Sequence, residues 1–513
     1  MKPIRLMSGF LTVGFWTLAS RILGFVRDAM ILGWLGTGPA YEAFVVAFRL
    51  PNMFRRFFAE GAFNTSFVPI FAKKLQGGQD AQGFASEAFS GLVAVLIALT
   101  LLAQAAMPWL IWGLASGFAG QEKFDLSVEF GRIAFPYILF ISLAALLSGV
   151  LNALGHFAAA AAAPILLNVV LVGSMGVVAW LGGDVARALV WGIPVAGVAQ
   201  MALVWVAAQR AGFRLIPGRP RWTPEMRHLV SVAVPAALAG GVVQVNLLVG
   251  QQVASYFDRA VGWLYAADRL YQLPLGVVAI AVGVVLLPEL ARRLQANDPA
   301  GARDALSRGT EVSLALTIPA AVALVVIPLP LVSVMFERGA TTATDSAAIA
   351  MAVLVYGLGL PAFVLQKLYQ PLFYAREDTR APFRYAVAAM VVNAVLAIGL
   401  APVIGWIACA IATTVAAWGM VGLLYVGSRK MGDAVRLDAR CTYRLPRIVL
   451  ASALMGAVLA AVNLGLGDWL YTGGVRYIAL TVLVAAGMVA YGLIGQAIGA
   501  FRLSEFRAVL RRR

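Results

Sequence analysis

Apolar stretches long enough to cross a membrane recur along the whole chain and constrain its fold more than any other feature. A helix needs about 20 apolar residues to cross a hydrocarbon core of about 30 Å. We count about fourteen such stretches in the 513 residues. They lie near 9–34, 41–72, 88–115, 127–154, 160–182, 186–209, 226–255, 262–290, 305–335, 345–373, 383–401, 403–428, 446–466 and 475–500. Because backbone groups in lipid must bond within their own segment, the pattern predicts an all-α polytopic membrane protein with about 14 transmembrane helices.

Composition supports the same class. Hydrophobic residues make up 61% of the chain and charged residues 12%, against roughly 45–50% and about 25% in soluble domains. The first apolar stretch is too long, and too charged internally, to be a cleavable signal peptide. We therefore expect the chain to remain in the membrane from its first helix onwards.

The net charge of +16 is distributed unevenly between the predicted loops. With the N-terminus inside, about 27 of the 40 Lys and Arg residues fall on one side of the membrane, which is the positive-inside asymmetry. We therefore expect a multi-pass protein with both termini in the cytoplasm. No recognition motif accompanies the charge, which argues against nucleic-acid binding. Cys409 and Cys441 form no CxxC or Cys/His cluster, so we expect neither a disulfide nor a metal site.

The two halves of the chain share a sequence repeat. FVPIFAKKLQ at 67–76 aligns with LLPELARRLQ at 286–295, and AFRL at 47–50 aligns with ADRL at 267–270. This offset spans six predicted helices, an even number, so the halves enter the membrane in the same orientation. Parallel repeats with a site at their interface are typical of transporters that work by alternating access.

The repeat predicts a division into three parts. We expect an N-terminal six-helix lobe at 1–215 and a C-terminal six-helix lobe at 216–435. The last two helices and the basic tail, at 436–513, fall outside this pattern. Their role is expected to be separate from that of the lobes.

Charged and polar residues interrupt three of the apolar stretches. They are Arg21, Arg27 and Asp28 in the first stretch, Arg49, Asn52, Arg55, Arg56 and Glu60 in the second, and Asp268 and Arg269 in the eighth. A charge near the centre of a spanning helix costs about 2.5–3.5 kcal/mol on insertion scales. Such residues are expected to line a water-filled cavity rather than to face lipid.

Spacing suggests how these residues are arranged. Arg21 and Asp28 are seven residues apart and share a helical face. Pro51 is expected to kink the second helix, and Asn52 follows the kink with an amide that can form hydrogen bonds. Asp268, beside Arg269, is compatible with either a salt-bridge gate or a proton site.

The arginines outnumber their local acidic partners. Arg56 and Glu60 form an i,i+4 pair, whereas the arginines without an evident local partner are Arg21, Arg49, Arg55 and Arg269. Guanidinium groups bind phosphate oxygens bidentately. We therefore predict a cationic cavity suited to an anion such as a diphosphate. The alternative is that these arginines snorkel to headgroups and only fix topology.

Several of these segments together resemble one bacterial family. SRILGFVRDA (20–29), AFRLPNMFRRFFAEGAF (47–63), FVPIFA (67–72), FPYILFISL (135–143), ADRLYQLPLGV (267–277) and FYAREDTRAP (373–382) are similar to the MurJ, or MviN, lipid II flippase family. The similarity extends over essentially the whole chain. The LPN–RR–FAEGAF block is its most specific part.

The resemblance implies a fold, a substrate and a set of site residues. The fold is that of the multidrug/oligosaccharidyl-lipid/polysaccharide exporter superfamily, with two six-helix lobes around a cationic cavity and two extra helices that form a groove. The substrate is lipid II, the undecaprenyl-diphosphate-linked peptidoglycan precursor, flipped from the inner to the outer leaflet of the bacterial cytoplasmic membrane. By motif, the binding arginines are Arg21, Arg27, Arg55 and Arg269, and the residues around the same cavity are Asp28, Asn52, Arg56 and Glu60.

Two family features match this sequence less well. Glu42 lies in YEAF, where the family often has Asp, so the charge is kept at that position. A cation site described for some members, on the seventh, eleventh and twelfth helices, finds no clear acidic ligand set here. The resemblance therefore gives no support for sodium coupling, and no cofactor is expected. Dependence on the membrane potential or on an unidentified counter-ion stays open.

The expected partners follow from the same resemblance. We expect a monomer that binds lipid II, and the cell-wall synthesis machinery is a candidate partner. Two other transporters are alternatives: a flippase for another polyprenyl-diphosphate-linked oligosaccharide, and a cation-coupled exporter of the same fold. A membrane enzyme would need paired acids on a metal or a base on a loop, and the sequence shows neither, so we expect no enzymatic activity.

Overall fold

Every regular element in the described part of the chain is a helix. The computed structural model describes residues 6–55, 62–216, 218–281, 287–296, 298–376 and 378–501. The chain divides into two compact units, residues 1–262 and 263–513. The boundaries predicted at 215/216 and 435/436 separate the two six-helix lobes and the last two helices. They were inferred from the sequence repeat and stay predictions.

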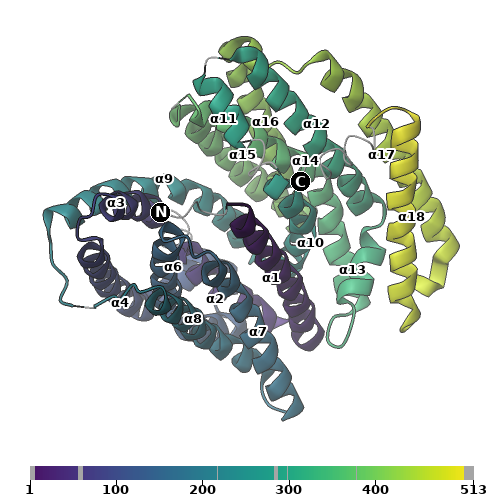
Figure 1. Cartoon of the computed structure of the whole chain (residues 1–513). Coiled ribbons are helices and arrows are strands. Elements are labelled where there is room, and N and C mark those ends of the chain that lie inside the picture. The colour runs from purple at the N-terminus through teal and green to yellow at the C-terminus, as the bar shows by residue number, and fades with distance from the viewer. Residues whose placement is uncertain are drawn as a thin grey trace. The chain divides into compact units, whose positions relative to one another are not determined.

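The described residues of the first unit form nine α-helices, and Figure 1 labels all of them except α5. They are α1 (Leu6–Leu35), α2 (Pro39–Arg55), α3 (Ala62–Gln76), α4 (Ala81–Leu114), α5 (Glu122–Ala134), α6 (Tyr137–Ala153), α7 (Ala158–Trp180), α8 (Val185–Arg210) and α9 (Pro224–Ala254). Within this unit α7 packs along both α1 and α8, α2 packs against α5, and α3 packs against α9. A short 3-10 helix, η2 (Ser116–Phe118), follows α4.

The second unit contains most of α10 and all of the helices that follow it. They are α10 (Ala260–Ala281), α11 (Leu287–Gln295), α12 (Pro299–Val326), α13 (Pro328–Phe336), α14 (Ala343–Tyr374), α15 (Arg380–Ile404), α16 (Ala408–Ser428), η5 (Arg429–Val435), α17 (Ala439–Leu466) and α18 (Val475–Ala497). Helix α12 contacts both α14 and α17, and α17 lies beside α18 at the edge of the unit (Figure 1).

The predicted membrane-spanning class is confirmed, whereas the count of fourteen spans stays a prediction. Within the described ranges, nine helical stretches are long and apolar enough to cross a membrane. Two of the predicted spans are divided into two helices at residues that the structure describes. The span predicted at 127–154 is divided at Pro136 into α5 and α6, and that at 305–335 is divided at Pro328 into α12 and α13. Proline lacks the backbone N–H that would continue the helix, which favours a break at both positions.

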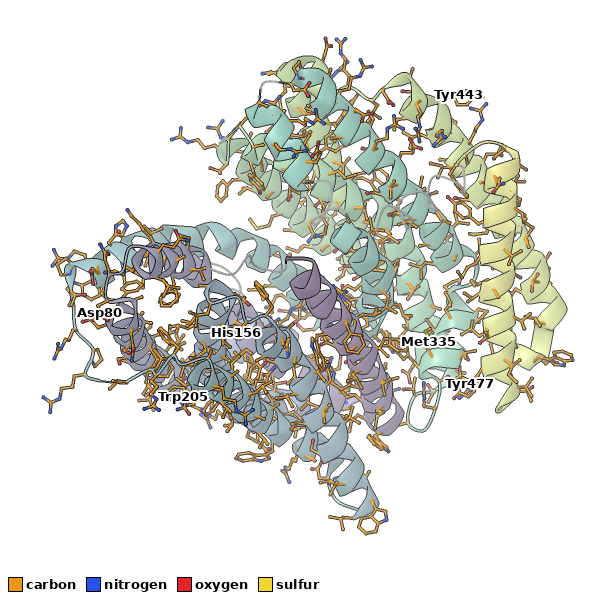
Figure 2. The ribbon with its side chains drawn as sticks, viewed as in Figure 1. Asp80, His156, Trp205, Met335, Tyr443 and Tyr477 are labelled. Atoms are coloured by element: carbon orange, nitrogen blue, oxygen red, sulfur yellow. The ribbon has the colours of Figure 1, made fainter. Side chains whose placement is uncertain are left out.

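The repeated segments end in the same kind of helix junction. After α3, the Asp80 carboxylate accepts a hydrogen bond from the Gly83 N–H at 2.7 Å and so caps α4; Asp80 is labelled in Figure 2. After α11, the Asp298 carboxylate accepts one from the Gly301 N–H at 2.8 Å and caps α12. A Cβ on Gly83 would lie 2.1 Å from the Asp80 carboxylate, and one on Gly301 would lie 2.2 Å from that of Asp298. The repeat therefore extends beyond the aligned letters into a shared Asp–x–x–Gly cap.

A buried ion network joins α12 to α17. Glu311 is 6% exposed and pairs with Arg308 at 2.5 Å, with Arg440 at 3.4 Å and, most closely, with Arg444. Arg308 also pairs with Asp438, the N-cap residue of α17. The network therefore bridges α12 and the first turns of α17 within the second unit.

Candidate functional site

Arg27 is held between two partners in the first unit. Its Nε and one terminal nitrogen donate to the Asp28 carboxylate at 2.9 and 2.6 Å. Its other terminal nitrogen donates at 2.9 Å to the Oδ1 of Asn168, which lies on α7. Arg27 is 8% exposed and Asp28 is 7% exposed. Arg27 therefore bonds both to its sequence neighbour Asp28 and across to α7.

Asn168 is fixed on its other side by α1. Its amide nitrogen donates to the Ser20 carbonyl oxygen at 2.9 Å. A Cβ at Gly24 would lie 3.6 Å from the Asn168 amide nitrogen, an ordinary van der Waals distance, so Gly24 packs beside Asn168 without being required for its position. Asn168 thus accepts from Arg27 and donates to the α1 backbone. This pair of hydrogen bonds sets the direction in which the guanidinium plane points.

Arg21 differs from Arg27 in its surroundings. It lies six residues earlier on α1 and its side chain is exposed. The nearby Leu18 and Ile22 side chains are exposed as well, at 56% and 58%. The two arginines of SRILGFVRD therefore occupy different environments, one open and one neutralised by a carboxylate.

Helix α2 places three further predicted residues in the same unit. Arg49 donates to the Gln251 side-chain oxygen of α9 at 2.5 Å. Asn52 donates to the Phe48 carbonyl oxygen of its own helix at 3.0 Å, in the turn that contains Pro51. Arg55 is half-buried at the last residue of α2.

Two predicted residues of the LPN–RR–FAEGAF block cannot be placed. Arg56 and Glu60 lie outside the described residues. Their predicted i,i+4 pairing stays a prediction.

Glu42 is at the centre of a second buried cluster. Its side chain is 1% exposed, and one carboxylate oxygen accepts from the Lys123 ammonium of α5 at 2.9 Å. The other oxygen accepts from the Val261 N–H at 3.1 Å, in the first turn of α10. An anion is favoured there because the first amides of a helix have no partners within the helix. The Lys123 ammonium also lies 4.5 Å from the centre of the Phe118 ring.

Arg269 and Asp268 belong to the second unit. The Arg269 guanidinium lies 4.3 Å from the centre of the Tyr265 ring and also donates to the Tyr265 hydroxyl. Asp268 accepts from the Gln272 amide one turn later. Arg269 therefore has a local aromatic partner that counting acidic residues did not reveal. A cavity shared by Arg269 and the arginines of the first unit stays a prediction.

Comparison with known proteins identifies the family. The family model described as "Lipid II flippase MurJ" matches residues 31–479. The chain belongs to the MurJ family. This confirms the resemblance inferred from the sequence motifs.

Curated members of the MurJ family match along almost the whole chain. A probable lipid II flippase MurJ of Rhizobium tropici is 42% identical, covering 99% of this chain and 97% of its own length. The lipid II flippase MurJ of Burkholderia cenocepacia is 35% identical, covering 84% of this chain and 85% of its own length.

Solved structures show the same fold. A lipid II flippase MurJ in an inward closed conformation superposes with a TM-score of 0.79 and 23% identity, covering 95% of this chain and 98% of that one. An inward-facing multidrug resistance MATE transporter of the MOP superfamily superposes with a TM-score of 0.65 and 14% identity, covering 80% of this chain and 96% of that one. The chain therefore shares the fold of these two transporters. The two six-helix lobes, the cationic cavity and the groove of the last two helices stay predictions.

Three partners of the site residues were missed in the sequence. Asn168, Gln251 and Lys123 hold Arg27, Arg49 and Glu42 from helices that are 141, 202 and 81 residues away in the chain. Asn168 is the one amide of α7, and Gln251 is one of several amides in α9, so nothing local distinguishes either of them from packing residues. The pairing of Lys123 could have been predicted, because a lysine just ahead of an apolar stretch can pair with an acid at the same membrane depth, here Glu42.

Proposed function

We propose that this protein flips lipid II from the inner to the outer leaflet of the bacterial cytoplasmic membrane. The observation that carries the proposal is the match to curated lipid II flippases, 42% identical over 99% of the chain. The exposed and half-buried arginines described above support it, because a lipid-linked diphosphate needs cationic donors at membrane depth. The reaction is transport without covalent chemistry, so no enzymatic activity is part of the proposal.

We assign the diphosphate to four arginines. Arg21 is exposed and makes the first contact, and Arg55 and Arg269 complete the set with Arg27. Arg27 is neutralised by Asp28 in this structure, so binding the diphosphate would require Arg27 to exchange part of that pairing for phosphate oxygens. Asp28 and Asn52 are assigned to the binding site beside these arginines. The supporting or gating positions are Glu42, Arg49, Arg56, Glu60 and Asp268.

The proposed cycle is alternating access. Binding of the anionic headgroup reduces repulsion among the arginines and favours closure on the cytoplasmic side. A ligand can drive this change only through its different affinity for the two states. Release outside then draws on the membrane potential, worth about 2.3 kcal/mol per charge per 100 mV, or on a counter-ion. Glu42, Lys123 and the start of α10 form a buried contact that could open and close in this cycle.

The topology is part of the proposal. The basic loops place both termini in the cytoplasm by the positive-inside rule. We propose a monomer whose undecaprenyl tail stays in lipid beside the last two helices, and which works together with the cell-wall synthesis machinery.

Depletion of the protein in its own host tests the function. Lipid II accessible from outside the cell should fall while the total lipid II pool rises. Complementation with Arg27→Ala or Arg55→Ala should fail although the variant proteins insert normally. Accumulation of a different polyprenyl-linked glycan, with externally accessible lipid II unchanged, would contradict the substrate. Normal growth on either variant would contradict the site.

A further inference from the structure

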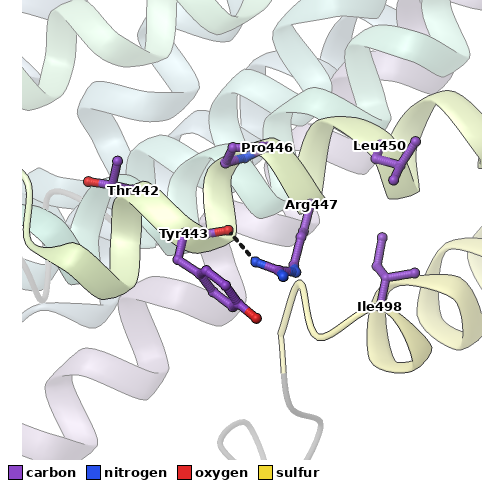
Figure 3. Close-up of a pocket in the computed structure, with 6 residues that line it drawn as sticks. All are labelled: Thr442, Tyr443, Pro446, Arg447, Leu450 and Ile498. Atoms are coloured by element: carbon purple, nitrogen blue, oxygen red, sulfur yellow. Dashed lines mark hydrogen bonds between the residues drawn. The ribbon is translucent and has the colours of Figure 1, made fainter.

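A pocket outside the arginine site lies on the outer face of α17. Its volume is about 680 Å³, and its lining residues are Thr442, Tyr443, Pro446, Arg447, Leu450 and Ile498. It is a wide hollow open to one side rather than an enclosed cavity. Figure 3 shows Tyr443 and Arg447 projecting from one side of α17, with Leu450 facing Ile498, which follows α18. One end of the pocket is thus cationic and the other is apolar.

Arg447 is built into this pocket with donors left over. Its guanidinium carbon lies 3.3 Å from the centre of the Tyr443 ring. One terminal nitrogen donates to the Tyr443 carbonyl oxygen at 2.8 Å. Within the part of the chain that the structure describes, no carboxylate pairs with Arg447, whereas Arg444 and Arg440 on the same helix pair with Glu311. A guanidinium has five N–H donors, so most of those on Arg447 can reach a ligand.

The depth of Arg447 matches the headgroup region of a membrane. The next 19 residues of α17, 448–466, contain no Asp, Glu, Lys or Arg. At 1.5 Å per residue they extend roughly 28 Å, close to the thickness of the hydrocarbon core. Arg447 is therefore the last charge before the core. Tyr443, 61% exposed, occupies the level where tyrosines form interfacial belts.

The opposite face of α17 is fully used in packing. Ile448 and Ala451 are buried in a cluster with Ala315 of α12 and with Ala500 and Phe501. Leu450, on the pocket side, is 50% exposed. The pocket face is therefore directed away from the protein core and toward the surrounding membrane.

We propose that this pocket binds one anionic phospholipid, with its phosphate on Arg447 and its acyl chains along Leu450 and Ile498. The choice of leaflet is the one part of this inference that rests on the topology proposed above. On that topology the lipid lies in the cytoplasmic leaflet. An undecaprenyl tail is a less suitable occupant, because an apolar chain has no charged group for the Arg447 guanidinium to bind. The chain's own C-terminal segment, 502–513, carries five arginines and one glutamate, so like charge disfavours it as the occupant.

Native mass spectrometry of the full-length protein with phosphatidylglycerol and with phosphatidylcholine of identical acyl chains tests this. The wild type should bind phosphatidylglycerol about fivefold more tightly, the gain expected for one interfacial arginine. Arg447→Gln should remove that preference. Arg429→Gln is the matched control, since Arg429 also lies over a tyrosine, Tyr425 at 5.9 Å, at the end of a helix. The control should keep the full preference.

A second variant separates the pocket from the charge. Leu450→Trp keeps Arg447 but fills the apolar wall, and it should weaken binding of both phospholipids at an unchanged thermal unfolding temperature. Three results would overturn the proposal. In the first, Arg447→Gln retains the phosphatidylglycerol preference. In the second, this variant loses lipid II binding and leaves phosphatidylglycerol binding unchanged, which would assign the pocket to the transported lipid. In the third, glycerol phosphate displaces phosphatidylglycerol at equal concentration, which would make the lipid chains irrelevant.

Discussion

At the scale of single residues, the arginines in apolar helices differ in how their charge is balanced. Arg27 donates to Asp28 and to Asn168, whereas Arg21 on the same helix is exposed. A buried charge without a partner is costly, and partner hydrogen bonds remove much of that cost. The charge of Arg27 is therefore balanced by its partners, and its availability to a substrate depends on how Asp28 and Asn168 hold it.

Asn168 is predicted to position Arg27. Replacing Asn168 with Ala removes the hydrogen bond at 2.9 Å and frees the guanidinium to rotate about its pairing with Asp28. Loss of one hydrogen bond to a charged group is worth about 1.5–3 kcal/mol. We expect lipid II transport in reconstituted vesicles to fall about tenfold or more. Ser174→Ala is the control, because among the described residues the Ser174 hydroxyl bonds to the carbonyl of Leu171 on its own helix. Equal transport by the two variants would exclude a positioning role for Asn168.

Lys123 and Glu42 should depend on each other for stability. Their side chains are 4% and 1% exposed. Breaking a buried ion pair from one side costs about 3–5 kcal/mol, because the remaining charge is left uncompensated. Lys123→Met should lower the thermal unfolding temperature strongly, and Glu42→Gln added to it should restore part of the loss.

An exposed ion pair in the same unit provides the control for Lys123. Arg187 and Glu129 pair at 3.1 Å with 58% and 42% of their side chains exposed. Exposed pairs contribute about 0–1 kcal/mol, so Arg187→Met should change unfolding little. If Lys123→Met and Arg187→Met change the thermal unfolding temperature equally, the buried pair is not a stabilising contact.

At the scale of helices, the sequence predicts the elements well and their interruptions less well. Each predicted apolar stretch overlaps at least one helix, because uninterrupted apolar residues leave a helix as the stable choice in lipid. The breaks at Pro136 and Pro328 were missed, since proline is also tolerated inside helices here, as at Pro108 of α4. Whether a proline divides a helix depends on the packing around it, which periodicity does not contain.

The ion network at Glu311 is predicted to hold α17 against α12. Glu311→Gln removes the charge shared by Arg308, Arg440 and Arg444, so the three guanidinium groups would repel one another across the junction. Backbone amides in the first turns of α17 should then exchange hydrogen about tenfold faster or more in deuterium-exchange mass spectrometry. The exchange rate of α15 should stay the same.

Asp433→Asn is the control variant. It tests whether the loss of any acidic charge in this region speeds amide hydrogen exchange in α17. Asp433 pairs with Arg436 at 3.1 Å, and both side chains are more than 70% exposed, at 73% and 74%. Solvent screens such a pair, so exchange in α17 should not change. Faster exchange in both variants would show that the effect is general and not due to the network.

At the scale of the whole molecule, charge and repeat patterns are visible in the sequence, whereas the partners of the site residues are not. Arginines in apolar stretches are rare enough to be recognised from composition alone. Their partners Asn168 and Gln251 come from helices 141 and 202 residues away. Contacts over such separations are set by how helices pack, so only the folded chain reveals them. The family motifs supplied the substrate, which no spacing argument could provide.

Orientation of the whole chain in the membrane follows from the distribution of charge and can be tested directly. The two native cysteines, Cys409 and Cys441, are 2% and 0% exposed, so replacing both with Ala provides a background for single-cysteine labelling. Lys430 lies in η5 on the side predicted to be cytoplasmic, and Thr472 lies in the loop between α17 and α18 on the other side. Both side chains are exposed.

A membrane-impermeant maleimide should therefore label Thr472→Cys in spheroplasts, where the outer face of the cytoplasmic membrane is accessible. It should label Lys430→Cys only after the membrane is permeabilised. The physical reason is the cost of moving basic loops across the membrane against the positive-inside bias. The reverse pattern would place the basic loops outside, which would invert the proposed direction of lipid II transport as well as the topology. Labelling of both sites before permeabilisation would indicate leaky membranes and calls for a cytoplasmic marker protein as an internal control in the same sample.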